Sequence, residues 1–592
     1  MKIRSFFFLT IIAAILGMVI ACGGGGHDEY TVRFEANGGY PAPQSQTVSS
    51  GGYITEPAPM TKTGYGFVDW YKEETFINLW NFTTDVVTGN ITLYAKWDNF
   101  NTNYTVKFEA NGGSPAPQNQ TISYGGKVTE PAYMTKVNYG FAGWYKEATL
   151  NSLWNFNYDT VTRDITLYAK WEQPVNVQGT TLTEKLQWLN SNAESNSFYI
   201  LEVSEDEFLG PQTLSYNDII NATSGYNIYI QLIGIGGVKN IELYGTGSLF
   251  TIGNGVTLIL DENIVLKGTS RVYVWSGNLI LNNGSKITGN LFSNLDGGGV
   301  LVNGGTFTMN GGEISGNAAY SGGGVYISNG TFTMNGGEIS GNTAGGGVYV
   351  SNGTFTMTGG EISGNTAGNY GGGVYVNGGT FTMTGGKISG NTASNYYGGG
   401  VYISNGTFTM IGGEISGNTA SSSYSSSSSY GGGVHISNGT FTMTGGEISG
   451  NTASSYGGGV YVDGTFAMTG GEISGNTAYS GGGVYVDGTF AMTGGEISGN
   501  TASSYVGGVY VSGSIEKTGG IITGYSSDTV NGNVVKRNNV VQGNGGHAVY
   551  VAHNDSRFVR RKETTAGQSD NLIYIRNEPN PPTISGAWDT DD

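Results

Sequence analysis

The fold of this chain is decided by residues 345–365, which read Gly-Gly-Gly-Val-Tyr-Val-Ser-Asn-Gly-Thr-Phe-Thr-Met-Thr-Gly-Gly-Glu-Ile-Ser-Gly-Asn. The last seven residues of this stretch occur eight times, with Glu or Lys at the third place, and successive copies lie 23 to 33 residues apart. A period of this size indicates stacked units, because a single unit cannot bury its own apolar face. The repeat predicts the architecture strongly, whereas a feature repeated eight times is more typical of a scaffold than of an active site.

Each unit contains three short strands separated by turn residues. Alternation places Val348, Phe355, Met357 and Ile362 on the same side of the chain, where they would form a core. Three strands per unit, at a period near 24 residues, predict a single right-handed parallel β-helix in which each rung adds about 4.8 Å. The Asn-Gly pair at 352–353 predicts a corner with positive φ.

The units resemble pectate-lyase-like β-helices, and especially the Gly-Gly-x-Ile repeats of polymorphic surface proteins of bacteria. We expect the β-helix to span 197–553, with near-identical rungs from about 297 to 524, and a closing segment at 554–592. In the linker 173–196, the sequence Thr-Leu-Thr-Glu at 181–184 fits a capping box. It predicts a short amphipathic helix that covers the open end of the stack.

Residues 30–172 hold a second, separate repeat. The two copies are offset by 74 residues throughout. Three tryptophans of the first copy recur at the equivalent positions of the second: Trp70, Trp80 and Trp97, then Trp144, Trp154 and Trp171. We expect most of these tryptophans to pack in small cores.

Three motifs in each copy carry a family resemblance. They are Phe-x-x-Asn-Gly-Gly, then Gly-Tyr-Gly-Phe-Val-Asp-Trp-Tyr at 64–71, then Asn-Ile-Thr-Leu-Tyr-Ala-Lys-Trp at 90–97. Both copies resemble the Listeria–Bacteroides repeat, also called the internalin B-repeat. The resemblance implies β-grasp-like modules at 30–98 and 104–172, which act as spacers or interaction modules on bacterial surfaces and have no catalytic role. Asp69 departs from the pattern, since the second copy has Gly143 there.

The amino terminus predicts the compartment. The chain begins with a positively charged segment, followed by an apolar stretch at 6–20 that is shorter than a typical transmembrane helix. The stretch ends in Val-Ile-Ala before Cys22, which resembles the bacterial lipoprotein signal. The resemblance implies that residues 1–21 are removed, that Cys22 is lipidated, and that residues 22–29 form a glycine-rich tether. An ordinary signal peptide with an incidental cysteine is the alternative. We expect a lipid-anchored, surface-exposed protein of the cell envelope, in the outer membrane.

Composition excludes several classes of protein. The net charge is −18 and there is no long basic run, which argues against nucleic acid as a partner. We expect the protein to be a monomer, and its single cysteine excludes a disulfide within one chain. The four histidines lack the spacing of metal ligands, and no phosphate loop, nucleophile elbow or zinc motif occurs, so we expect no metal, cofactor or catalytic residue.

Stacking converts each repeated residue into a column. One column should form an inward or corner ladder of side-chain amides that hydrogen-bond between rungs: Asn317, Asn342, Asn365, Asn391, Asn418, Asn451, Asn476 and Asn500. Seven glutamates form another column, interrupted by Lys387. Their like charges predict a solvated face, with weak cation binding as the alternative: Glu313, Glu338, Glu361, Glu414, Glu447, Glu472 and Glu496.

An aromatic column faces outward in the same alternation. Exposed tyrosines could stack against sugar rings or an extended peptide, whereas the alternative is a self-stacking ladder that only stabilises the helix. The column consists of Tyr326, Tyr349, Tyr375, Tyr402, His435, Tyr461, Tyr485 and Tyr510. Loops of uneven length follow each repeated asparagine and would lie along one edge.

These features favour a non-enzymatic, lipid-anchored adhesin or interaction scaffold that binds a glycan or a host or bacterial surface protein. Two alternatives stay open. One is a polysaccharide-degrading lyase or glycosidase of the pectate-lyase-like class, which would need a non-repeated cluster of charged residues in a groove. The other is a passive surface spacer.

Overall fold

The computed structural model describes residues 28–586, except 216–227, 423–427, 525–531, 538–539, 542–547, 553–573, 577–583 and some single residues and pairs elsewhere. The predicted lipidation site Cys22 and most of the predicted tether lie outside the described residues. The chain divides into two compact units, one formed mainly by the two modules and the other mainly by the stacked region.

Each amino-terminal module is a four-stranded sheet with the same topology in both copies. In both modules the two central strands run parallel and the first of them has an antiparallel neighbour on its outer side. In the first module the other outer strand, β3, is antiparallel as well. In sheet order the first module has β2 (Gln46–Ser49), β1 (Glu29–Glu35), β4 (Ile91–Asn99) and β3 (Tyr65–Tyr71), and the second has β6 (Gln120–Ser123), β5 (Asn103–Glu109), β8 (Ile165–Glu172) and β7 (Gly140–Tyr145).

The module motifs have clear physical roles. In the first module Asn37 has a φ of 49° and its side-chain amide donates to the carbonyl of Ala95 at 2.8 Å, which ties the Asn-Gly turn to the central strand. Asn111 repeats this bond to Ala169 at 2.7 Å. Trp70 packs edge-on against Phe34 in the first core.

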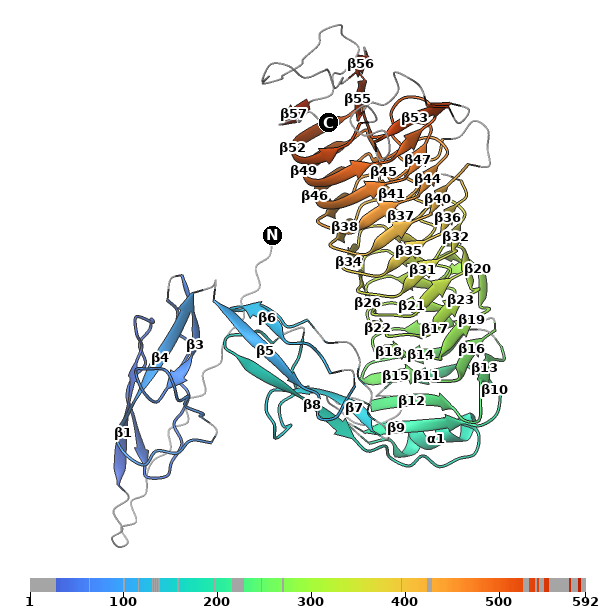
Figure 1. Cartoon of the computed structure of the whole chain (residues 1–592). Helices are drawn as coiled ribbons and strands as arrows, with labels where there is room; N and C mark the ends of the chain where they lie inside the picture. Colours follow the sequence, from blue (N-terminus) through green and yellow to red (C-terminus); the bar gives the residue numbers. More distant parts are fainter. Residues whose placement is uncertain are drawn as a thin grey trace, which may run out of the picture. The chain divides into compact units, whose positions relative to one another are not determined.

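A capping helix precedes the stack, as predicted. Helix α1 (Leu182–Asn192) begins after Thr181, whose side chain accepts from the backbone of Glu184 in a complete capping box. Three leucines of α1 are buried in the β-helix core, and these leucines are Leu182, Leu186 and Leu189. In Figure 1 the helix lies at this end of the stack, and its buried leucines cover apolar side chains of the core.

Most of the described residues from 198 onward form a parallel β-helix, which confirms the predicted fold class (Figure 1). The irregular first rungs contain β9 (Phe198–Val203), β10 (Glu207–Leu209), β11 (Gln212–Leu214), β12 (Ile228–Gly234), β13 (Lys239–Leu243), β14 (Ser248–Ile252), β15 (Val256–Leu260), β16 (Ile264–Lys267), β17 (Arg271–Val274), β18 (Asn278–Leu281), β19 (Lys286–Thr288) and β20 (Leu291–Asp296).

The regular rungs repeat three strands, and each strand pairs in parallel with its equivalent in the next rung. The first strand of the rung is β21 (Val300–Val302), β25 (Val325–Ile327), β29 (Val348–Val350), β33 (Val374–Val376), β37 (Val401–Ile403), β41 (Val434–Ile436), β45 (Val460–Val462), β48 (Val484–Val486), β51 (Val509–Val511) and β55 (Val549–Ala552). The second is β22 (Thr306–Met309), β26 (Thr331–Met334), β30 (Thr354–Met357), β34 (Thr380–Met383), β38 (Thr407–Met410) and β42 (Thr440–Met443). The third is β23 (Glu313–Ser315), β27 (Glu338–Ser340), β31 (Glu361–Ser363), β35 (Lys387–Ser389), β39 (Glu414–Ser416) and β43 (Glu447–Ser449). In later rungs the second and third strands merge into β46 (Thr465–Ser474), β49 (Thr489–Ser498) and β52 (Ser514–Ile522).

A very short additional strand follows the repeated asparagine, where sequence reasoning expected only a loop. It comprises β24 (Ala318–Ser321), β28 (Thr343–Ala344), β32 (Thr366–Ala367), β36 (Thr392–Ala393), β40 (Thr419–Ala420), β44 (Thr452–Ala453), β47 (Thr477–Ala478) and β50 (Thr501–Ala502). The described part ends with β53 (Val534–Arg537), β54 (Val540–Val541), β56 (Tyr574–Arg576) and β57 (Ile584–Gly586). A two-residue strand carries no readable alternation, so only pairing between rungs reveals it.

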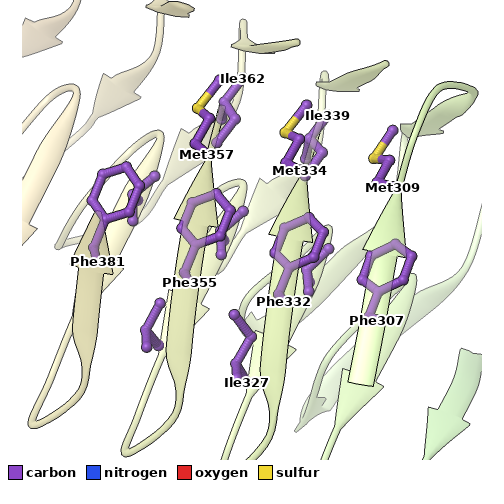
Figure 2. Packing of buried hydrophobic residues seen from close by; sticks show 14 of the residues in the cluster. Phe307, Met309, Ile327, Phe332, Met334, Ile339, Phe355, Met357, Ile362 and Phe381 are labelled. Atoms are coloured by element: carbon purple, nitrogen blue, oxygen red, sulfur yellow. The ribbon is translucent and has the colours of Figure 1, made fainter. Parts of the chain in front are cut away.

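The core is a set of continuous inward columns. Val348, Phe355, Met357 and Ile362 are all fully buried, as the alternation predicts. Figure 2 shows the phenylalanines of successive rungs lying parallel, with their methionines aligned beside them. From Phe307 to Phe490, successive ring centroids are 4.5 to 4.8 Å apart and their planes differ by only 5° to 6°. The phenylalanines in this region therefore repeat with nearly the same orientation from rung to rung.

The predicted reason for the Asn-Gly corner at 352–353 is wrong. Neither residue has a positive φ. Glycine is required at 353 because an added Cβ would lie 2.4 Å from the carbonyl oxygen of Gly330 and 2.4 Å from a side-chain carbon of Ile327. Close approach of consecutive rungs, and not backbone handedness, selects glycine at this corner.

Candidate functional site

The repeated asparagines form a buried hydrogen-bonded ladder. All eight predicted members are fully buried. The backbone N–H and side-chain amide of Asn365 both donate to the Oδ1 of Asn391, at 3.0 and 2.9 Å, and the same amide donates to the carbonyl of Ile339 at 2.8 Å. The ladder extends one rung beyond the repeats at each end, to Asn290 and Asn533. Every side chain is used within the protein, so this column is a scaffold.

The glutamate column lies at the surface in continuous register. Two lysines offset part of its negative charge. Lys286 precedes the first glutamate and lies 2.7 Å from Glu313, and Lys387, which interrupts the column, lies 3.0 Å from Glu414. A hydrogen bond from Ser416 and the ion pair with Lys387 hold the pKa of Glu414 below its usual value. The predicted solvated column is therefore partly neutralised by its own lysines.

One shallow groove of about 690 Å³ runs across the later glutamates. It is lined by Gly413, Gly446, Glu447, Gly471, Glu472, Gly495, Glu496 and Ile521. Three equivalent carboxylates stand side by side there, all exposed. Glycosidic cleavage needs two carboxyls in different environments, one acid and one base, and this translational repeat makes the three alike.

The aromatic column occupies one register position, and consecutive rings contact each other. Tyr326 and Tyr349 stack at 4.9 Å with planes 9° apart, and Tyr485 and Tyr510 stack at 4.5 Å and 10°. Beyond the predicted members the column continues to Tyr550, 4.9 Å from Tyr510. Burial raises the pKa of Tyr485 to about 12, so its hydroxyl stays protonated near neutral pH.

A second aromatic column, which sequence reasoning missed, lies on the first. It contains Tyr370, Tyr397, Tyr430 and Tyr456, whose backbones form consecutive parallel bridges. Its rings stack at 5.3 to 5.6 Å. Each of these tyrosines stands directly before Gly-Gly-Gly, and this constant place at the end of loops of uneven length is the signal that could have revealed the column.

The second column corrects the prediction of an exposed stripe in the centre of the first. Tyr402, His435 and Tyr461 are buried, with 7%, 4% and 8% of their surfaces exposed. Rings of the second column cover them: Tyr397 lies 4.7 Å from His435 and Tyr430 lies 4.7 Å from Tyr461. The remaining predicted members are half-buried, and these members are Tyr326, Tyr349, Tyr375, Tyr485 and Tyr510.

His435 takes the place of a tyrosine in the covered part of the column. Burial lowers the pKa of His435 to about 3, and its Nδ1 has no hydrogen-bond partner in the described part of the chain. The imidazole is therefore neutral and packed, and it is unsuited to bind a ligand.

The solvent-facing side of the two-column region is formed by the second column and its neighbours. Tyr370, Tyr479 and Tyr505 expose 39%, 47% and 37% of their surfaces. In the second column adjacent tyrosines occupy the ring faces, so the exposed surface of these partly buried side chains lies mainly at the ring edges. We call this surface, formed by the second column over the first, the tyrosine face.

The tryptophans of the first module contribute mainly to its core, as expected. Trp70 and Trp80 are 2% and 5% exposed, and the side chain of Trp97 is partly buried and donates to the carbonyl of Ala36 at 2.8 Å. Lys72 lies over the Trp80 ring at 5.4 Å. Trp144 and Trp154 of the second copy are buried as well.

Across the described residues there is no group of three or more His, Cys, Asp or Glu side chains able to hold a metal ion. Within the same part of the chain, no helix has both the length and the apolar character needed to cross a membrane.

Comparisons with known proteins identify the modules. The Listeria-Bacteroides repeat domain matches residues 30–96 and 104–170, so the chain carries two such repeats followed by a parallel β-helix. Internalin H of Listeria monocytogenes is 33% identical over 172 residues, which cover 28% of this chain and 30% of the internalin.

Two proteins of Evansella cellulosilytica are also similar. A putative Gly-rich membrane protein is 44% identical over 145 residues, 24% of this chain and 16% of the relative. A putative membrane protein is 42% identical over 143 residues, 24% of this chain and 21% of the relative. The chain thus spans less than a third of the length of each of these curated relatives.

Proposed function

We propose that the chain is a non-enzymatic protein of the bacterial cell envelope that is held to a membrane by a lipid on Cys22 and acts as an adhesin or interaction scaffold. The Listeria–Bacteroides repeats support this proposal, as do relatives named as membrane proteins and as an internalin. The β-helix would then project from the surface, and an outer-membrane location is the form that we expect for an anchored lipoprotein.

The observation that carries the proposal is the tyrosine face. A row of partly exposed tyrosine rings repeats once per rung along the helix axis, at ring spacings of 5.3 to 5.6 Å. Tyrosine provides a rigid apolar body with a polar tip, and stacking has already fixed these side chains, so little entropy is lost on binding. Such a row suits an extended ligand with a short repeat, either a glycan or a strand of a surface protein.

A binding screen tests the proposal. The full chain is applied to glycan and extracellular-matrix arrays, and each hit is measured again with Tyr370→Ala plus Tyr397→Ala. We expect saturable binding that this double variant weakens by about tenfold or more. The control is Tyr244→Ala, which removes a tyrosine that is 65% exposed outside both columns.

Two results would contradict the proposal. Turnover of a polyuronate or another polysaccharide by the purified chain would show an enzyme. Failure to bind any glycan or matrix protein would leave a passive spacer. Labelling with a radioactive fatty acid tests the anchor separately, since Cys22→Ala should abolish incorporation.

A further inference from the structure

The strands that carry the stacked phenylalanines present a third kind of surface on their outer side. In one rung, the side chains of Thr354, Thr356 and Thr358 point outward. Each of the eight rungs from β22 to β49 has the same three outward positions. All of these positions are threonine except Asn310, Asn335, Ile411, Ala467 and Ala491. We call this surface the threonine face.

The threonine face is flat. Adjacent strands normally rotate by about 20–25° relative to each other, which would turn a face of eight strands into a propeller. In Figure 2 the strands that carry Phe307, Phe332, Phe355 and Phe381 run side by side with little rotation, and the planes of consecutive rings beneath the face differ by only 5° to 6°. In β30 to β42 the first two columns pair Thr with Thr without any shift of register. A flat periodic surface is complementary to another copy of itself.

The face carries no charge in an otherwise acidic molecule. The chain has a net charge of −18, so two copies repel each other over most of their surfaces. None of the outward positions of the face from β22 to β49 holds a charged residue. In the described part of the chain, the hydroxyls of its first two columns have no hydrogen-bond partner within the protein, so they are free to bond across an interface.

The size of the face suits a weak, specific contact. Eight strands at 4.7–4.9 Å and three positions along each strand give a surface of about 600 Å² per copy. Two copies would bury about 1,200 Å² in total, the low end of specific interfaces. Threonine is stiff at χ1, so ordering its side chains costs little. We infer that the threonine face is a homotypic interface through which two copies of this chain associate reversibly, in contrast to the monomer expected from sequence.

The borders of the face determine the orientation of the pair. On one side the face is bordered by the glutamate column, since Glu361 lies three residues beyond Thr358. On the other side it is bordered by the corner before Thr354, which is uncharged in the earlier rungs and carries Asp463 and Asp487 in two later ones. A two-fold axis along the helix axis places each glutamate column opposite the partner's corner, so the helices run parallel. An antiparallel pair would place the two glutamate columns opposite each other.

In a parallel pair, the amino-terminal ends of the two β-helices lie at the same end of the dimer. Two copies anchored in one membrane have this arrangement, so the pair would form between neighbours on a single cell surface. That last step depends on the lipid anchor of the proposed function, whereas the pairing of the threonine faces does not.

Sedimentation of the full chain tests the pairing. All proteins carry Cys22→Ser to avoid disulfide dimers. We expect a concentration-dependent monomer–dimer equilibrium in the micromolar range, which Thr354→Glu plus Thr380→Glu weakens by about tenfold or more. The control is Thr452→Glu plus Thr477→Glu, the same charge change at exposed threonines of β44 and β47. A monomer at all concentrations up to about 100 μM, or equal weakening by both pairs, would overturn the inference.

Cross-linking tests the orientation. In a parallel pair the central column lies along the two-fold axis, so each of its residues faces its own counterpart. Thr333→Cys, near one end of the face, should therefore be captured as a dimer by a bis-maleimide that spans facing sheets about 10 Å apart. Dimers that sediment normally but are not captured through Thr333→Cys would overturn the parallel arrangement.

Discussion

The inward and outward columns of the β-helix come from equally repetitive sequence, yet repetition has opposite consequences in them. Inward, Phe355 and Asn365 are fully buried and contact their equivalents in neighbouring rungs. Outward, Thr354 faces water and Glu361 lies at the surface. Inward repetition accumulates stability, because each rung adds the same interface. Outward repetition produces an extended surface of uniform chemistry, because every rung exposes the same side chain at the same position.

The largest effect should come from an inward aromatic. Phe381→Ala removes a fully buried ring that stacks on both neighbours, and we expect a loss of about 3–5 kcal/mol in the free energy of unfolding. Thr382→Ala, the next residue and an outward one, should cost less than about 1 kcal/mol. Urea unfolding followed by circular dichroism measures both. Equal losses would remove the distinction between the two kinds of column.

The asparagine ladder should be the next most sensitive. Asn391→Ala leaves the backbone N–H and the side-chain amide of Asn365 without their acceptor. Two buried donors without partners should cost about 2–4 kcal/mol. Asn352→Ala, at an exposed corner, is the matched control and should be nearly neutral. Hydrogen exchange of the adjacent rungs would locate the loss, and unchanged protection around Asn365 would contradict the ladder's role.

His435 challenges the comparison, because an outward position is buried. Its pKa is about 3 in the folded chain against a usual value near 6.5, so between these pH values the unfolded chain binds more protons. Stability should therefore fall as pH decreases below about 6.5, by about 2 kcal/mol at pH 5 relative to pH 8. His435→Tyr restores the residue of the column, and the difference in unfolding free energy between the two proteins should be constant at high pH and should change in acid, where only the His435 protein loses this stability. Parallel pH profiles would mean that His435 is accessible to protons when folded.

The smallest effect should come from the glutamate column. Lys387 and Glu414 form a surface ion pair whose side chains are 42% and 37% exposed. Lys387→Glu removes the pair and completes a run of like charges, so we expect a loss of about 0.2–1 kcal/mol that shrinks in high salt. Lys387→Gln separates loss of the pair from added repulsion. A loss that does not depend on salt would indicate a structural role for the lysine.

Much of the fold was predictable because it depends on local alternation and a fixed period. The buried Val, Phe, Met and Ile columns follow from the sequence of one rung, since side chains alternate along each strand. The capping helix is equally local, and its capping box reads directly from residues 181–184. Identical rungs must then place equivalent residues above one another, which puts the asparagines in one column.

The candidate site was less predictable, because it depends on residues outside the repeated positions. The second tyrosine column is supplied by loops of different lengths, and its residues become aligned only when their backbones bridge between rungs. That column buries Tyr402, His435 and Tyr461, which alternation alone assigns to the surface. The requirement for glycine at 353 was unpredictable for the same reason, because it comes from close contact with the neighbouring rung and not from the conformation of its own backbone.

The sequence by itself thus determined which residues face inward, that the units stack, and that two separate modules precede the stack. The tertiary structure alone decided which outward columns are covered, how flat the threonine face is, and which rings reach the solvent. The physical reason is the range of the interactions. Orientation along a strand is set by the two-residue period of its backbone, whereas exposure and flatness are set by contacts between rungs more than twenty residues apart.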